Sequence, residues 1–163
     1  ISSGRTKERE ATVTSAGAAN AGDMVGLDAT GKLDNSVLPT GIGAETKILP
    51  ASEDLAAGDF VNAWEDAGTL SVRKADASTQ GKQADGFVLA AVTTGNDATV
   101  YTAGINDQLS GLTGGPTMFL SATTPGDATA TAPTASGNIV QTIGTRLSAT
   151  EIAFEPGEPK ELA

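Results

Sequence analysis

Short stretches of alternating apolar and polar residues recur along residues 51–156, and each ends at a group of turn-forming residues. Alternation with a period of two is typical of strands with one buried face, and strands spaced about 8–12 residues apart are typical of a sandwich or barrel. The breaks at 65–68, 93–97 and 123–127 are rich in Gly, Pro, Asn and Asp, which favour tight turns. The expected strands are 60–64, 70–75, 86–92, 98–103, 117–122, 128–132, 138–147 and 151–154.

The segments on either side of this body have no sustained apolar period. Residues 1–20 are predicted to be an extended N-terminal arm, and residues 21–50 a hairpin-like element and linker with one short helical turn near Asp34. Residues 51–156 form the predicted body, and the polar residues 157–163 a C-terminal tail that leaves the fold as an extended strap. The predicted fold class is therefore all-β, with a small β-barrel or β-sandwich body.

The N-terminal arm carries three regularly spaced cations, Arg5, Lys7 and Arg9, which alternate with Glu8 and Glu10 near its end. A segment this polar does not bury enough apolar surface to fold alone. It is either a solvated tail or an arm that orders on a neighbouring subunit, where it would gain main-chain hydrogen bonds at an exposed strand edge.

One local pattern occurs twice. Residues 21–25 read Ala-Gly-Asp-Met-Val and are followed by Gly-Lys-Leu at 31–33, while residues 57–61 read Ala-Gly-Asp-Phe-Val and are followed by Gly-Thr-Leu at 68–70. The pattern predicts a turn, a strand and a hairpin. Two copies are too few to indicate a solenoid, and they represent either a duplication or one local solution used twice.

Charge and composition exclude several classes of partner and of chemistry. The net charge of −10 opposes binding to a phosphate backbone, so nucleic acid is not expected as a partner. There is no His and no Cys, which removes Ser–His and Cys–His dyads, disulfides, and thiolate or imidazole metal sites. No apolar run approaches the ~20 residues that span a bilayer, and no signal peptide is evident, so no membrane association is expected.

Three patterns that resemble ligand sites are better explained as turns. Residues 26–32 fit the G-x-x-x-x-G-K part of a phosphate-binding loop, but Leu33 stands where Ser or Thr is needed. The oxygen-rich group of Asp28, Asp34 and Asn35 lacks the spacing of an EF-hand. Carboxylate pairs that would suit glycoside hydrolysis fall mostly in predicted turns, and the chain has only one Trp and one Tyr to bind a sugar. These pairs are Glu53/Asp54, Glu65/Asp66, Asp97/Asp107 and Glu151/Glu155. We predict no catalytic residue, metal or cofactor, and no enzymatic activity.

Trp64 is the chain's one tryptophan and lies on the predicted strand 60–64. On an extended strand it shares a face with Phe60 and Asn62. Core packing is the favoured interpretation, and the alternative is an anchor at a subunit contact, where Trp is enriched. Together with Arg5, Lys7 and Arg9, Trp64 completes the set of candidate capsid or inter-subunit contacts.

The arrangement of these segments resembles that of tailed-bacteriophage capsid decoration (cement) proteins. The resemblance covers about residues 18–156 and rests on GDFV at 58–61, KADA at 74–77, GFVL at 86–89, FLSATTPG at 119–126 and GNIVQ at 137–141. It implies a structural virion protein, made in the cytoplasm of a bacterial host, that binds the outer capsid surface as a homotrimer. Its partner would be the major capsid protein, whose neighbouring subunits it would clamp against the pressure of the packaged DNA.

The segment 21–39 also resembles parts of tail-fibre proteins, so a tail-fibre or baseplate module that faces the receptor is the alternative. A lectin or a carbohydrate-acting enzyme is a third possibility, which the scarcity of aromatic residues opposes. The shortness of the chain and its two flanking segments favour the cement protein.

Overall fold

The computed structural model describes residues 10–38 and 45–163, and the chain divides into two units, Ile1–Gly43 and Ala44–Ala163. Among the described residues of the first unit, one parallel bridge joins Thr12 to Val25. The 3₁₀ turn η1 (Gly17–Asn20) lies between these two residues in the chain, and a second 3₁₀ turn, η2 (Asn35–Val37), follows them. The main-chain N–H of Ser36 donates to the Asp34 carboxylate at 2.9 Å, which confirms the short helical turn expected near Asp34. None of the residues 10–38 whose exposure is described is buried.

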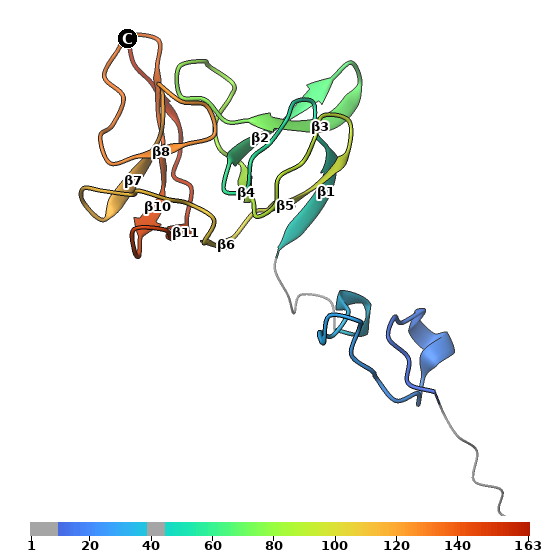
Figure 1. Ribbon diagram of the computed structural model, residues 1–163. Coiled ribbons are helices and arrows are strands. Elements are labelled where there is room, and N and C mark those ends of the chain that lie inside the picture. Colours follow the sequence, from blue (N-terminus) through green and yellow to red (C-terminus); the bar gives the residue numbers. More distant parts are fainter. Residues whose placement is uncertain (1–9, 39–44) are drawn as a thin grey trace, which may run out of the picture. The chain divides into compact units, whose positions relative to one another are not determined.

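The second unit contains two antiparallel sheets of five strands each (Figure 1). The first sheet has the order β1-β5-β4-β2-β3. Its strands are β1 (Thr46–Pro50), β2 (Phe60–Asp66), β3 (Thr69–Lys74), β4 (Gly86–Val88) and β5 (Asp97–Tyr101). Ala67 and Gly68, with φ values of 48° and 87°, join β2 to β3 through the turn expected at 65–68.

The second sheet has the order β6-β11-β10-β7-β8 and lies beside the first in Figure 1. Its strands are β6 (Gly104–Asn106), β7 (Thr117–Leu120), β8 (Ala128–Thr129), β10 (Thr142–Arg146) and β11 (Ile152–Phe154). The two remaining strands, β9 (Ile139–Val140) and β12 (Lys160–Glu161), form a separate antiparallel pair.

An aromatic stripe joins the two sheets. Phe60, Phe87 and Tyr101 lie opposite one another on β2, β4 and β5, so their side chains share one face of the first sheet. Phe154 of the second sheet packs against two of them, with ring centroids 5.8 Å from Phe60 and 5.5 Å from Phe87. Buried aliphatic residues complete this core from the second sheet: Met118, Leu120, Ile143 and Ile152.

The other face of the first sheet has its own apolar core, which explains why the body folds with few aromatic residues. Val61, Val72, Val88 and Val100 come from four of its strands, and Leu55 packs with them from the loop after β1. Both faces of this sheet therefore carry buried apolar residues. The all-β prediction is confirmed, and the two facing sheets fit an open, sandwich-like body.

Several expected boundaries are wrong. Residues 46–50 were assigned to a linker but form β1, so the body begins before residue 51. The strand expected at 86–92 ends at Val88, and β6 was not anticipated. The strand expected at 138–147 is split at Gln141, whose buried amide exchanges hydrogen bonds of 2.8 and 3.0 Å with the main chain of Ala84. The main-chain carbonyl of Gln141 still accepts a hydrogen bond from the N–H of Leu120 at 3.0 Å, so this side-chain contact is additional to main-chain pairing.

The C-terminal tail does not leave the fold as a strap. β12 pairs with β9, the N–H of Leu162 donates to the carbonyl of Asn138 at 2.9 Å, and the N–H of Gly157 donates to the carbonyl of Thr142 at 2.8 Å. The polar composition of residues 157–163 concealed this docking, because main-chain pairing needs no apolar side chain.

Candidate functional site

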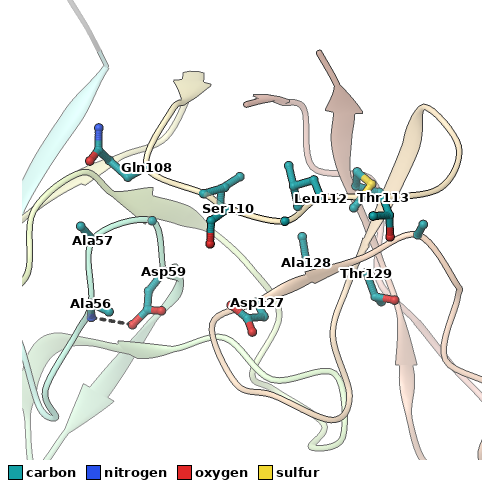
Figure 2. A pocket seen from close by; sticks show the side chains of 15 residues that line it. Ala56, Ala57, Asp59, Gln108, Ser110, Leu112, Thr113, Asp127, Ala128 and Thr129 are labelled. Carbon is teal, nitrogen blue, oxygen red and sulfur yellow. Dashed lines mark hydrogen bonds between the residues drawn. The ribbon is translucent and has the colours of Figure 1, made fainter. Parts of the chain in front are cut away.

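A cleft of about 360 Å³ lies in the body. Its walls are the turn before β2, the loop between β6 and β7, and the start of β8. Figure 2 shows Asp59 and Asp127 on one wall, facing Leu112 and Thr113 of the loop across Ala128 and Thr129. The cleft is lined by small, aliphatic and hydroxyl side chains, with these two carboxylates as its charged groups.

Polar contacts from two side chains, one buried and one partly exposed, hold the β6–β7 loop at the cleft. The amide of Asn106, which is fully buried, donates to the carbonyl of Gly58 at 2.8 Å. The guanidinium of Arg146 donates to the carbonyls of Leu112 and Gly114 at 3.3 and 2.7 Å. Gly58 has φ +92°, and a Cβ added there would come within 2.6 Å of the Gln108 carbonyl oxygen. The loop therefore lies directly on the turn before β2.

The two carboxylates of the cleft have different environments. Asp59 is buried, accepts a hydrogen bond from the N–H of Ala56 at 2.7 Å, and forms an ion pair with Lys74 at 3.2 Å. Asp127 is exposed as a residue, but its carboxyl is packed closely enough against the protein that desolvation raises its pKa. The negative charge of Asp59 raises the pKa of Asp127 further, and the charge of Lys74 lowers it.

This arrangement is suited to holding the turn rather than to acid–base chemistry. The Asp59 carboxylate is engaged by a main-chain donor and a lysine, so its bonding capacity is used within the fold. No aromatic side chain lines the cleft, which removes the usual platform for a sugar ring. Sequence reasoning missed this site, because Asp59, Asn106 and Arg146 are far apart in the chain and no motif links them.

Trp64 is not a core residue, contrary to the favoured interpretation. It is half-buried, belongs to neither apolar core, and lies beneath the Arg73 guanidinium, whose central carbon is 4.4 Å from the ring centroid. Its indole N–H donates to the Ser52 hydroxyl at 3.1 Å. The strand alternation placed Trp64 on the correct face, but of the β2 residues on that face only Phe60 belongs to the core shared with the second sheet.

A polar network extends from this tryptophan into the sheet. The side chain of Asn62 is buried, accepts a hydrogen bond from Arg73 Nε at 2.9 Å, and donates to the Asp85 carboxylate at 2.9 Å. Desolvation raises the pKa of Asp85, although hydrogen bonds from Ala63 and Asn62 act in the opposite direction. The network holds Trp64 and Arg73 together as a partly exposed surface, the Trp64–Arg73 surface.

The other predicted contacts, Arg5, Lys7 and Arg9, lie outside the described residues. The loop at 26–32 is a turn, as predicted. The Asp28 carboxylate accepts hydrogen bonds from the N–H groups of Thr30 and Lys32 at 2.8 and 2.9 Å, which are the kind of donors that a phosphate would need. The bond from Lys32 and then that from the Thr30 hydroxyl lower the pKa of Asp28.

No group of three or more His, Cys, Asp or Glu side chains suited to a metal ion occurs within 10–38 and 45–163. Over the same residues, none of the helices has the length and hydrophobicity needed to cross a membrane. Comparison with known proteins found no matching family model, no similar curated protein and no similar solved structure.

Proposed function

We propose that this chain is a structural protein of a tailed-bacteriophage virion that binds the outer surface of the assembled capsid and clamps neighbouring capsid subunits. The proposal begins from the resemblance described above. It is supported most by one contrast: a well-packed β-body is joined to an N-terminal unit whose described residues include exposed apolar side chains and none that is buried.

The contrast is visible in the exposed apolar residues. Nine large apolar side chains are exposed among the described residues, and five belong to the N-terminal unit: Val13, Met24, Val25, Leu27 and Leu33. The buried apolar side chains of the described residues all belong to the body. A segment that keeps such side chains in water gains free energy when another surface covers them.

A shell is a suitable partner for such a segment. A ligand that binds only the assembled form stabilises assembly by mass action, and many copies act together. The rigid body would provide bulk and the Trp64–Arg73 surface, while the N-terminal unit would reach across the seam between capsid subunits. None of these roles requires a cofactor or a catalytic group.

The first experiment is to measure, by quantitative mass spectrometry of purified particles, the copy number of this chain relative to the major shell protein. A ratio near one copy per shell subunit supports the proposal. A few copies per particle would reject it in favour of a tail-fibre or baseplate module, and absence from the particle would reject both.

A second experiment tests the N-terminal unit directly. Replacing Met24, Val25 and Leu27 with Ser should weaken binding to shells that lack this protein by about tenfold or more, because each residue loses apolar area that would be buried. The matched control replaces the exposed body residues Ile105 and Leu147 with Ser. Equal losses for both variants would show that general hydrophobicity, and not the N-terminal unit, causes binding.

A further inference from the structure

The first sheet has a partly open edge at β1. Among the described residues β1 forms a ladder with β5, and its C-terminal end approaches β3. There Ala51, which follows β1, forms a bridge with Val72, and the N–H and the hydroxyl of Ser52 both donate to the Val72 carbonyl. The open part of the edge is therefore its N-terminal half, at Thr46 and Ile48. The carbonyl of Glu45 and the N–H of Ala51 both bond toward the β5 side. Because main-chain groups alternate in direction along a strand, Thr46 and Ile48 point their N–H and C=O groups away from β5.

This edge has some of the features that protect edge strands, but they leave its N-terminal half open. The strand is short, Lys47 is charged and Pro50 removes one donor, whereas Thr46 and Ile48 are exposed. Ile48 is the most exposed large apolar residue among those described, at 69%. An open edge beside an exposed isoleucine is a template for an additional strand.

The two faces of this edge carry opposite charges. Ile48 pairs with Thr99, and Pro50 pairs with Asp97, so the acidic Asp97 lies on the Ile48 face. Lys47 pairs with Val100 and lies on the opposite face. A strand that adds here would match the edge best with cations on the Asp97 face and acids on the Lys47 face.

The N-terminal residues of this chain have that pattern. In an extended conformation Arg5, Lys7 and Arg9 fall on one face, and Glu8 and Glu10 on the other. The net charges of the two segments are also opposite. Residues 1–9 hold three basic residues and one acidic residue, whereas residues 44–163 hold six basic and fifteen acidic residues. The arm is thus attracted to the body of another copy, although whole copies repel one another.

We propose that residues 4–10 of one copy add as a strand to the open part of the β1 edge in a second copy. Arg5, Lys7 and Arg9 then lie on the Asp97 face, and Glu8 lies on the Lys47 face. Each copy has one arm and one edge, so the contact is head-to-tail and closes into a ring if the rotation between copies allows it.

The test is self-association of the full chain, measured by sedimentation velocity over a range of protein and salt concentrations. The wild-type chain should associate, and association should weaken as salt rises, because exposed charge pairs are screened. Replacing Arg5, Lys7 and Arg9 with Glu should weaken association on the order of tenfold. A chain that remains monomeric throughout, or a variant that associates as well as wild type, overturns the proposal.

Paired variants test the edge and the charge arrangement. Ile48→Lys should weaken association, whereas the matched control Leu147→Lys, also at an exposed leucine, should leave it unchanged. Lys47→Glu and Glu8→Lys should each weaken association, and their combination should restore it. If Leu147→Lys acts as strongly as Ile48→Lys, or the combination fails to restore association, the proposed contact is wrong.

These outcomes are separate from those for capsid binding. A chain that associates as described but binds no shell rejects the proposed function and leaves this inference intact. A chain that binds shells but remains monomeric rejects this inference and leaves the proposed function intact.

Discussion

The two Ala-Gly-Asp-apolar-Val segments have nearly the same local sequence and opposite environments. In the body, Phe60 and Val61 have 0% exposure and open a seven-residue strand. In the N-terminal unit, Met24 and Val25 are 58% and 55% exposed, and Val25 forms only a single bridge, with Thr12. The two apolar residues after the aspartate belong to the core in the body. In the N-terminal unit, where none of the described residues is buried, the corresponding two residues are exposed. Local sequence therefore determines the turn, whereas the surrounding structure determines how much the residues after it contribute to the free energy of unfolding.

The largest expected difference between the two Ala-Gly-Asp-apolar-Val segments is at the residue after the aspartate, Phe60 in the body and Met24 in the N-terminal unit. Phe60→Ala should lower the free energy of unfolding by about 3–5 kcal/mol, because it empties the centre of the aromatic stripe. Met24→Ala should change it by less than about 0.5 kcal/mol, as for most exposed sites. Urea unfolding followed by Trp64 fluorescence measures both. Equal effects would contradict the assignment of separate roles to the two copies.

The glycines of the two copies provide the next comparison. Gly58 and Gly22 both have positive φ, but a Cβ would meet the Gln108 carbonyl at Gly58 and nothing within 4 Å at Gly22. Gly58→Ala should therefore destabilise the body by about 2–4 kcal/mol through backbone strain and displacement of the β6–β7 loop. Gly22→Ala should leave the thermal unfolding of the body unchanged. A harmless Gly58→Ala would mean that the loop does not rest on this turn.

Replacing the aspartates of the two segments, Asp59 and Asp23, should give a smaller difference in the free energy of unfolding. Asp59→Ala removes a main-chain hydrogen bond and the partner of Lys74, and should cost about 1–3 kcal/mol. Asp23 accepts hydrogen bonds from the Thr12 hydroxyl and the Asn20 amide at an exposed site, so Asp23→Ala should have little effect on the unfolding of the body. Asp59→Asn is the control, since it keeps the acceptor and removes the charge. If Asn and Ala cost the same, the ion pair accounts for most of the stabilisation.

The smallest expected difference between the two units is in the pKa values of their carboxyl groups. Hydrogen bonds from Lys32 and Ser36 lower the pKa values of Asp28 and Asp34, respectively, whereas desolvation raises those of Asp85 and Asp127 in the body. Carboxyl carbon shifts in an NMR titration should show the two groups on opposite sides of the ordinary value of 3.8. Asp85 and Asp127 on the low side would contradict the environments described here.

These shifts also set the sign of the pH dependence of stability. For Asp85 and Asp127 the folded state binds the proton more tightly, so their contribution is fully present below pH 3.8 and is lost as pH rises through the raised pKa. Asp85→Asn should remove part of this decline. The lowered groups contribute in the opposite sense, above 3.8, and lose their contribution as pH falls.

The sequence by itself determined the local features. The alternation of residues 60–64 and 70–75 located β2 and β3, the Glu-Asp-Ala-Gly sequence set their turn, and Asp28 and Asp34 set turns in the N-terminal unit. These features depend on residues a few positions apart, whose steric and hydrogen-bonding preferences act whatever the rest of the chain does.

Only the tertiary structure decided which strands pair and which side chains meet. β1, β6 and β12 are short or polar and become strands through partners distant in the chain, and the side chain of Gln141 meets the main chain of Ala84 only in the folded body. The position of Trp64 outside the cores and the cleft at Asp59 and Asp127 arise in the same way. The physical reason is that alternation specifies the two faces of a strand but not its neighbours, and the neighbours determine burial, charge environment and the edge left open at β1.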